Sequence, residues 1–190
     1  MPELPEAEVA ARQLRERVVG ATVRDCWIGR EDIVREGLPS LDQYRQAKIT
    51  GVERKGKSVI LHFLCGKEPR FLVAELGMTG LLLFRSTLTK HPQHTHFILH
   101  LDGCCEPDIR YWNPRRFGRL SLLDRAGLDR YVARRFGHDP LTISHEQFLR
   151  VLRATRSRLK SLLMHQQVIA GIGNIYANEI LFRSRLHPNQ

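Results

Sequence analysis

Short apolar runs between residues 21 and 123 constrain the fold of this chain most strongly. Eight such runs alternate with turn residues, and each has the length and pattern of a strand. They are Ala21–Ile28, Lys48–Arg54, Ser58–Leu64, Phe71–Leu76, Leu81–Phe84, His96–Leu101, Ile109–Trp112 and Arg119–Leu122. So many strands with short connections predict an antiparallel β-sandwich or a flattened barrel.

Helical periodicity flanks this β region on both sides. From Pro2 to about Val19 the apolar residues recur at helical spacing, and Gly20 ends the run. Further helices are predicted near Leu128–Phe136, Ser144–Thr155, Ser157–His165 and Asn174–Arg183. The predicted class is therefore α+β, with a leading helix and an antiparallel β-sandwich domain over residues 1–130. A helical module over residues 131–190 follows it.

The formal net charge is +10, and most of the excess lies in the second half of the chain. Residues 101–190 hold 15 of the 30 Lys and Arg but only 8 of the 20 acidic residues. A basic half that faces nucleic-acid phosphates is one interpretation. Since 24 of the 30 cations are Arg, a compositional bias is the other. No apolar run approaches the roughly 18 residues of a membrane span, so we expect no membrane contact.

Cysteine and histidine spacing predicts no metal site within these residues. The four cysteines form no C-x-x-C pair, so we expect reduced thiols rather than a disulfide framework or a structural zinc site. His94 and His96 are spaced to share one face of a strand, but no ligand residue joins them at metal-binding spacing. The acidic N-terminus lacks the features of a secretory signal, which predicts a cytoplasmic protein.

Pro2 and Glu3 form a candidate catalytic pair. Removal of Met1 would expose the secondary amine of Pro2, and an α-amino pKa of roughly 7.7–8.0 lies much nearer neutrality than that of a lysine. Such an amine can attack a sugar anomeric carbon and form an iminium ion, while Glu3 transfers the proton. The alternative is structural, since Pro and Glu also begin ordinary helices.

Five motifs follow one another along the chain. They are Pro2-Glu3-Leu4-Pro5-Glu6, Gly56-Lys57-Ser58, Leu76-Gly77-Met78-Thr79-Gly80, Asn113-Pro114-Arg115-Arg116-Phe117-Gly118 and Ala170-Gly171-Ile172-Gly173-Asn174-Ile175-Tyr176-Ala177-Asn178-Glu179. In this order, from residue 2 to about residue 188, they resemble the signatures of formamidopyrimidine-DNA glycosylases. The resemblance implies a base-excision-repair enzyme that acts as a monomer on damaged double-stranded DNA, in the cytoplasm and associated with a bacterial-type nucleoid.

The resemblance assigns catalytic roles to Pro2, Glu3 and Lys57. Lys57 would contact the phosphates that flank the damaged nucleotide, and Glu6 would lie against the extruded nucleotide itself. From the residues alone, Lys57 is also consistent with a solvated charge at a strand edge. Glu6 is equally consistent with the acid that a first helical turn favours.

A set of wedge residues is also implied by the resemblance. Met78 and Phe117 would fill the stack that the extruded nucleotide leaves, and Arg115 or Arg116 would face the orphaned base, with Arg115 assigned by position. Taken alone, Met78 beside a hairpin turn is typical of a core residue. The two arginines alone are typical of a solvated loop.

The last motif is similar to the family's helix–two-turn–helix DNA-binding element. Glycines before a helix let backbone N–H groups converge on an anion. The implied DNA-binding residues are Gly171, Gly173, Asn174 and Tyr176, with Lys160 on the preceding helix and His94 on the β domain. A Gly-x-Gly pair alone also occurs in tight helix turns.

The sequence departs from the family pattern in several places. Asn113 stands where Asp is usual, Glu75 where His is usual, and His165 where Asp is usual. The family also has a C-terminal zinc finger with two C-x-x-C pairs, and its Zn²⁺ would bind outside these 190 residues. We therefore expect a fragment or a shortened homologue, with no cofactor bound by this chain.

Three functions remain open from the sequence, beside a structural fragment with no independent role. The first is a glycosylase and AP lyase that removes 8-oxoguanine and formamidopyrimidines through an N-terminal proline Schiff base. The second is a catalytically weak or inactive fragment that binds damaged DNA without the finger. The third is an endonuclease VIII-like glycosylase for pyrimidine lesions, which Leu4 disfavours because that branch more often has Gly there.

Overall fold

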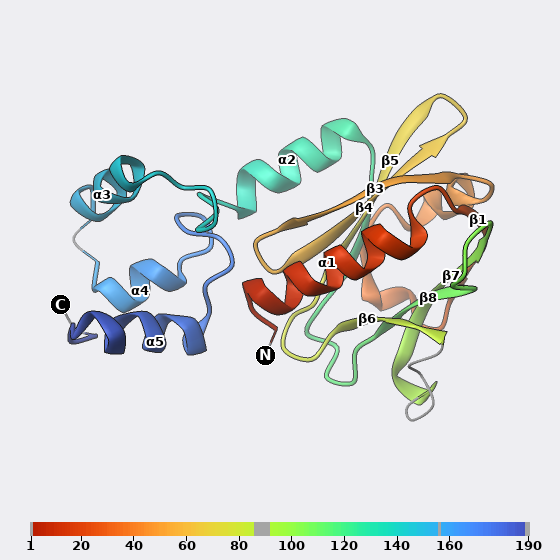
Figure 1. Ribbon diagram of the computed structural model, residues 1–190. Coiled ribbons are helices and arrows are strands. Elements are labelled where there is room, and N and C mark those ends of the chain that lie inside the picture. Colours follow the sequence, from red (N-terminus) through yellow and green to blue (C-terminus); the bar gives the residue numbers. More distant parts are fainter. Residues whose placement is uncertain (1, 86–91, 156, 189–190) are drawn as a thin grey trace.

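The computed structural model describes residues 2–85, 92–155 and 157–188, and it places a β-rich part beside a helical part (Figure 1). Helix α1 (Leu4–Val18) runs across the sheet, and its first residues face the helical part. The backbone N–H of Leu4 donates to the carbonyl of Gly171 over 3.0 Å, so the two parts meet at the start of α1. This architecture confirms the predicted α+β class.

Nine strands of the described residues form one sheet in the order β2-β9-β5-β4-β3-β1-β7-β8-β6. They are β1 (Thr22–Ile28), β2 (Val34–Glu36), β3 (Lys48–Lys55), β4 (Ser58–Cys65), β5 (Glu68–Glu75), β6 (Leu81–Phe84), β7 (Thr95–Asp102), β8 (Asp108–Trp112) and β9 (Leu120–Leu123). Neighbouring strands are antiparallel except β2 and β9, which are parallel. Strands β1 and β3 share a single pair of register partners, Thr22 and Lys48, so the sheet divides there into two halves.

One apolar core joins the two halves of the sheet and the buried face of α1. The helix buries Leu4, Ala7, Ala11, Leu14 and Val18, which recur at the three- and four-residue spacing of one helical face. Ala11, Leu14 and Val18 pack with side chains from β3, β4 and β5 and from β7 and β8. The halves therefore form the sandwich that the strand pattern predicts.

The structure differs from the expectation between residues 29 and 47. This segment contains β2 and two short 3₁₀ helices, Glu31–Ile33 and Leu38–Tyr44, none of which the sequence predicted. Strand β2 has three residues, too few to show a period of two. The segment is fixed instead by tertiary contacts, because Tyr44 is buried and its hydroxyl donates to the carbonyl of Phe71 over 2.9 Å.

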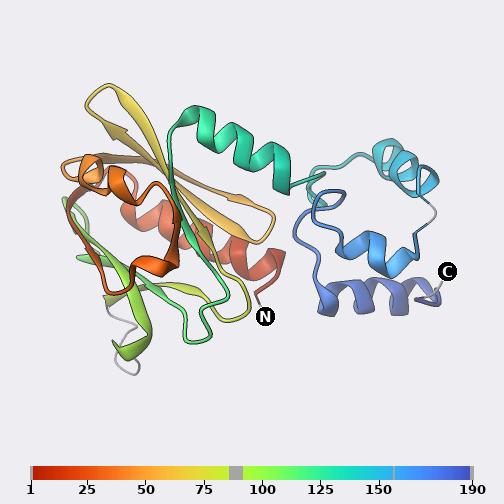
Figure 2. The same cartoon turned by 180° about the vertical axis from the view of Figure 1, so that it is seen from behind.

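Within the described residues, four helices follow the sheet: α2 (Arg125–Arg135), α3 (His145–Arg153), α4 (Leu159–Met164) and α5 (Asn174–Ser184). Helix α2 starts three residues earlier than expected because Asp124 caps it, accepting a bond from the N–H of Gly127. Its buried Leu128 and Tyr131 pack on the sheet. Figure 2 shows α3, α4 and α5 gathered at one end of the molecule, around a small core of their own. The predicted boundary between residues 130 and 131 falls inside α2 and stays a prediction.

Candidate active site and nucleic-acid interface

The carboxylate of Glu3 lies at the N-terminus of α5. Glu3 is buried, with 1% of its surface exposed, and it accepts hydrogen bonds from the backbone N–H groups of Gly173, Ile175 and Tyr176 at 2.8, 2.9 and 3.2 Å. The first N–H groups of a helix lack partners within the helix and lie at its positive end. They therefore stabilise a carboxylate anion at the junction of the two parts.

Pro2 directly precedes Glu3 in the chain and is buried just before α1 begins at Leu4. It lines a hollow of about 420 Å³ together with Pro5, Glu6 and apolar residues that include Leu76. A carboxylate oxygen of Glu6 accepts the backbone N–H of Glu3 over 3.0 Å. The structure thus places Pro2 and Glu6 on one hollow and joins Glu6 to the backbone of Glu3; the roles of the three residues stay predictions. Met1, whose removal would expose the Pro2 amine, lies outside the described residues.

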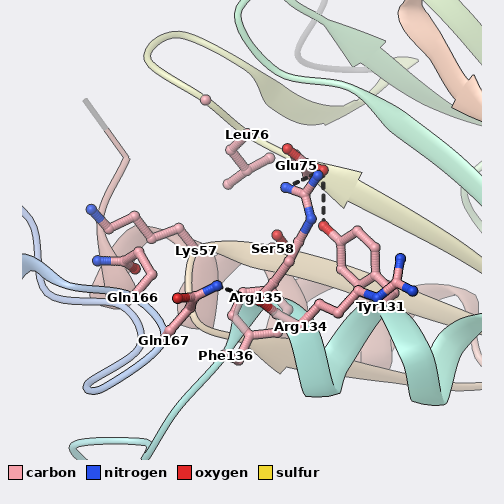
Figure 3. A pocket seen from close by; sticks show the side chains of 11 residues that line it. Lys57, Ser58, Glu75, Leu76, Tyr131, Arg134, Arg135, Phe136, Gln166 and Gln167 are labelled. Carbon is pink, nitrogen blue, oxygen red and sulfur yellow. Dashed lines mark hydrogen bonds and ion pairs between the residues drawn. The ribbon is translucent and has the colours of Figure 1, made fainter.

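Lys57 lies in the turn between β3 and β4 and is half-buried rather than solvated. Burial lowers the pKa of the Lys57 amine, and the negative charge of Glu3 opposes that shift. The lysine lines a hollow of about 310 Å³ with Glu75, Leu76, Tyr131 and Gln166 among its walls (Figure 3). Since Leu76 borders both this hollow and the one at Pro2, Lys57 and Pro2 belong to one region of the surface.

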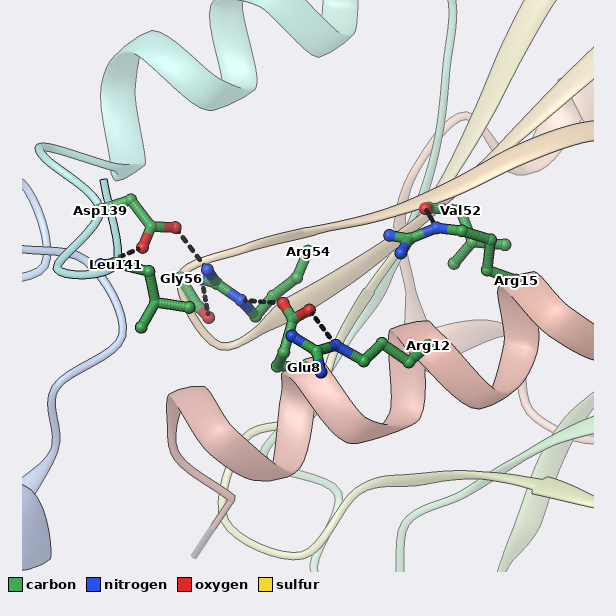
Figure 4. Close-up of polar contacts among 8 residues, drawn as sticks. All are labelled: Glu8, Arg12, Arg15, Val52, Arg54, Gly56, Asp139 and Leu141. Carbon is green, nitrogen blue, oxygen red and sulfur yellow. Dashed lines mark hydrogen bonds and ion pairs between the residues drawn. The ribbon is translucent and has the colours of Figure 1, made fainter. Parts of the chain in front are cut away.

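Arg54 fixes the turn that carries Lys57. Its side chain is 5% exposed and pairs with Glu8 of α1 at 2.9 Å and with Asp139 of the helical part at 2.5 Å. It also donates to the carbonyl of Gly56 (Figure 4). The guanidinium groups of Arg12 and Arg54 hold the pKa of Glu8 below its usual range. One side chain therefore ties α1, the Lys57 turn and the helical part together.

The predicted wedge residues lie on two loops that touch. Met78 and Phe117 are 38% and 58% exposed, and the guanidinium of Arg115 lies 5.4 Å from the centre of the Phe117 ring. A Cβ added at Gly77 would lie 2.5 Å from the backbone nitrogen of Gly118. This close backbone contact holds the two loops side by side and leaves large apolar and cationic side chains on the surface.

Asn113 links the two wedge loops through hydrogen bonds of its buried side chain. It is fully buried, and its amide oxygen accepts bonds from the Thr79 hydroxyl at 3.2 Å and the Arg116 backbone N–H at 3.0 Å. Its amide nitrogen donates to the Tyr111 hydroxyl over 3.0 Å. Arg116 has a left-handed backbone, with φ of 55°, and its carbonyl accepts a bond from Arg119. The asparagine therefore fixes the turn that carries both arginines.

The glycine-rich loop before α5 is organised by Gln166. Its amide nitrogen donates to the carbonyls of Met164 and Ile172, and its amide oxygen accepts the N–H of Gly171 over 2.9 Å. These three bonds fix the loop between α4 and α5. The backbone N–H groups that bind Glu3 come directly after this loop. The predicted DNA-binding residues here, Gly171, Gly173, Asn174 and Tyr176, lie together, with Asn174 and Tyr176 exposed. Lys160 lies on α4.

The paired histidines do not share a strand face, which corrects the sequence interpretation. His94 ends a short 3₁₀ helix and β7 begins at Thr95, so only His96 lies on the strand. His96 is buried against the carbonyl of Asn113 at 3.0 Å, and burial lowers the pKa of its ring. The ring of His94 lies at an edge-on angle to Trp112. His94 is thus beside the wedge loops, where its DNA-binding role stays a prediction.

The part of the chain that the structure describes offers no set of residues that fits a zinc ion. It contains no group of three or more His, Cys, Asp and Glu side chains close enough to hold a metal. All four cysteines are free thiols, and burial raises the pKa of Cys26 to about 12. None of the described helices is long and apolar enough to cross a membrane.

Two residues that shape the site, Arg54 and Gln166, escaped the sequence patterns, and a third, Asn113, appeared only as a departure from the family pattern. Arg54 lies two positions before the Gly56-Lys57-Ser58 motif and Gln166 follows the departure at His165, and those positions were the available signal. Arg54 had the appearance of a solvated charge, whereas its burial depends on a helix and a loop distant in sequence. Gln166 belongs to no motif, and its three bonds appear only once the chain has turned.

Comparisons with known proteins show which family the chain resembles. The model of the formamidopyrimidine-DNA glycosylase N-terminal domain matches residues 1–120, and that of the family's H2TH domain matches residues 136–190. A formamidopyrimidine-DNA glycosylase from Thermomicrobium roseum is 38% identical over 99% of this chain and 69% of its own length. The homologue from Desulforamulus reducens is 34% identical over 100% of this chain and 69% of its own length.

Solved structures show the same likeness. The MutM (Fpg) protein from Thermus thermophilus is 36% identical, with a TM-score of 0.81 over 100% of this chain and 66% of that one. The Lactococcus lactis enzyme bound non-covalently to DNA with an AP site is 26% identical, with a TM-score of 0.84 over 99% of this chain and 72% of that one. Fold and site together define a DNA glycosylase that joins a β-sandwich to a helix–two-turn–helix module. Within that class, the chain belongs to the formamidopyrimidine-DNA glycosylase family, which confirms the resemblance.

Proposed function

We propose that this chain is a base-excision-repair glycosylase and AP lyase that removes oxidised purines from double-stranded DNA through Pro2. Relatives named formamidopyrimidine-DNA glycosylase support the reaction class. Related solved structures hold DNA that contains N7-benzyl-Fapy-dG or carbocyclic 8-oxo-G, which supports the choice of purine lesions. The observation that carries the proposal is the buried carboxylate of Glu3, the residue that follows Pro2, held by three backbone N–H groups.

The chemistry follows from these groups. The neutral amine of Pro2 attacks C1′ of the damaged nucleotide, and the bond to the base breaks as the base leaves with the electron pair and gains a proton. The amine then loses its N–H proton, and the C1′–O4′ bond breaks as O4′ gains a proton, which opens the sugar ring and forms an iminium between Pro2 and C1′. The resulting iminium acidifies the C2′ hydrogen, so a base can remove it and the 3′ phosphate is eliminated. A second elimination releases the 5′ phosphate. Glu3 is the group proposed to transfer protons in these steps.

The surrounding residues hold the DNA in this proposal. Lys57 and Asn174 bind phosphates near the damaged nucleotide, with Lys160 and His94 adding further contacts. Met78, Phe117 and Arg115 or Arg116 occupy the gap in the duplex, because extrusion of a nucleotide costs a few kcal/mol that substitute stacking partly recovers. The chain acts as a monomer in the cytoplasm, which light scattering after gel filtration and fractionation of cells would check.

Borohydride trapping tests the catalytic proposal. Protein without Met1 is mixed with an 8-oxoguanine duplex and with an otherwise identical undamaged duplex, and the peptide linked to DNA is mapped. The expected result is a lesion-dependent adduct at Pro2 that Pro2→Gly reduces. Absence of an adduct, under conditions in which the Thermus thermophilus relative forms one, would reject catalysis by this chain. A thymine glycol duplex in parallel measures any preference for pyrimidine lesions.

A non-catalytic DNA-binding fragment gives a different result in the same experiment. It would bind duplex DNA in a salt-dependent way, but the affinity would be the same with and without the lesion and in Pro2→Gly. Binding that discriminates the lesion by about tenfold or more would reject this alternative.

A further inference from the structure

A basic surface extends from Lys57 over helix α2. The hollow beside Lys57 meets a second hollow of about 190 Å³, and the two share Tyr131, Arg134 and Arg135 as walls. The second hollow is also lined by Arg35 and Arg130. We call the side chains of Lys57, Arg35, Arg130, Arg134 and Arg135 the α2 basic surface.

Two carboxylates among the walls, Glu36 and Glu75, leave this surface with an excess of positive charge. Glu75 accepts the Tyr131 hydroxyl at 2.9 Å and pairs with Arg135 at 3.0 Å (Figure 3). It also pairs with Arg35 at 3.5 Å. The guanidinium of Arg135 also lies over the Tyr131 ring at 4.9 Å. Glu75 thus gathers two arginines from different elements into fixed positions on the same surface.

Arg130 and Arg134 differ from the arginines that Glu75 holds. Both are exposed, and among the described residues neither forms an ion pair. Cations in the last turn of a helix are favoured by its dipole, which would account for Arg134. The helix dipole does not account for the position of Arg130, one turn earlier, or for that of Arg35 in β2. Free guanidinium groups grouped beside fixed ones suit a ligand with several anionic groups.

We propose that the α2 basic surface binds the phosphate backbone of duplex DNA beyond the nucleotides that contact Pro2 and Lys57. This inference rests on the proposed function, because the surface is continuous with the hollow of Lys57. A polyanion is favoured over a single phosphate since the two hollows lie side by side and are open. DNA is favoured over an acidic protein because the adjoining site belongs to a DNA glycosylase family.

The test compares two charge-matched double variants. R130Q/R134Q removes the two unpaired arginines, whereas K48Q/K67Q removes two exposed cations at the other end of the β3–β4–β5 strands from Lys57. Affinity for an undamaged duplex is measured by fluorescence anisotropy over a range of salt concentrations. Log affinity falls as log salt rises, and each lost phosphate contact makes this slope shallower by about 0.9. We expect R130Q/R134Q to have a slope that is shallower by about 1.8 and to bind at least about tenfold more weakly, with K48Q/K67Q close to wild type.

A charge-conserving variant separates loss of contacts from loss of structure. R130K/R134K should keep the salt slope of the wild type, and circular dichroism checks the fold of every variant. Equal slopes for R130Q/R134Q and K48Q/K67Q would overturn the inference, and so would a lysine variant as weak as the glutamine variant. If Lys57→Gln weakens binding and Pro2 still forms the adduct while R130Q/R134Q binds normally, the inference fails and the proposed function stands. If no adduct forms but R130Q/R134Q binds DNA more weakly than K48Q/K67Q, the proposed function fails and the inference about the α2 basic surface stands.

Discussion

The backbone N–H of Gly173 donates to the carboxylate of Glu3 over 2.8 Å, although 170 positions separate the two residues. This bond joins the first residues of the β-rich part to the start of α5. A Cβ added at Gly173 would overlap the Glu3 side chain, so the glycine provides the space that the carboxylate occupies. Glu3 is therefore both a candidate proton-transfer group and a contact between the two parts.

Replacement of Glu3 by Gln should reduce stability and adduct formation together. The amide nitrogen cannot accept hydrogen bonds, so at least one of the three N–H donors loses its partner, at a cost of about 1–3 kcal/mol. Glu6→Gln is the matched control, because a glutamine oxygen can still accept the N–H of Glu3. Urea unfolding and borohydride trapping measure the two effects. A Glu3→Gln protein as stable as Glu6→Gln would contradict the bridging role.

The contact between the wedge loops can be tested by a pair of glycine substitutions. Gly77 and Gly66 have nearly the same left-handed backbone, with φ of 60° and 63°, so alanine costs about 1–2 kcal/mol of strain at either position. At Gly77 the new Cβ also meets the Gly118 backbone, whereas at Gly66 it meets open space. We expect Gly77→Ala to lower the free energy of unfolding by at least about 1 kcal/mol more. Equal losses in urea would exclude a tight contact between the loops.

DNA binding through Lys57 should weaken as the pH rises, and at lower pH than for an ordinary lysine. Burial lowers the pKa of the amine, and only its protonated form attracts phosphate. Lys57→Arg stays charged throughout, since guanidinium remains protonated over this range. Duplex affinity at constant ionic strength between about pH 7 and about pH 10 should fall for the wild type relative to the arginine variant. Parallel curves would show that Lys57 does not titrate against phosphate.

Arg54 should contribute more to stability than the neighbouring Arg12. Arg54→Gln removes bonds to three elements and should lower the free energy of unfolding by about 1–3 kcal/mol. Arg12 is 65% exposed and makes one pair with Glu8, so Arg12→Gln should cost about 0.5 kcal/mol or less. Chemical unfolding at neutral pH compares the two variants. Similar losses in the free energy of unfolding would contradict the role of Arg54 in joining α1, the Lys57 turn and the helical part.

The same pair of variants should differ from the wild type in acid. Because the folded pKa of Glu8 is lowered, its contribution is complete above the usual glutamate pKa. It is lost as the pH falls from there towards the lowered value. Either substitution removes part of that shift, so both variants should lose less stability than the wild type across this window. A wild-type stability that does not change across it would rule out the contribution of Glu8.

Local patterns predicted most strands and helices but not the contacts that create the site. Strands such as β4 and β6 were predictable because apolar and turn residues mark their ends. The segment around β2 was not, since it depends on Tyr44 reaching Phe71. The motifs pointed to Glu3 and Gly173 separately. Their hydrogen bond is a tertiary contact between opposite ends of the chain. The periodicity of apolar residues along the sequence does not encode such a contact.

The resemblance supplied roles, whereas the structure supplied the residues that support them. Asn113 was noted as a departure from Asp, and its amide proves to donate to Tyr111 while accepting from both wedge loops. A carboxylate would lack that donor. Glu75 was noted as a departure from His, and it pairs with two arginines and a tyrosine. In each case a single changed side chain has neighbours whose chemistry suits it.

The bridge from Glu3 to the start of α5 has a consequence for a divided protein. Expressed separately, the β-sandwich would carry Pro2 with Glu3 lacking its three donors, and the helical module would carry the donors with no acid. Catalytic competence would then depend on reassociation of the two pieces, as in split-enzyme reporters, and a mixture should recover adduct formation that neither piece has alone.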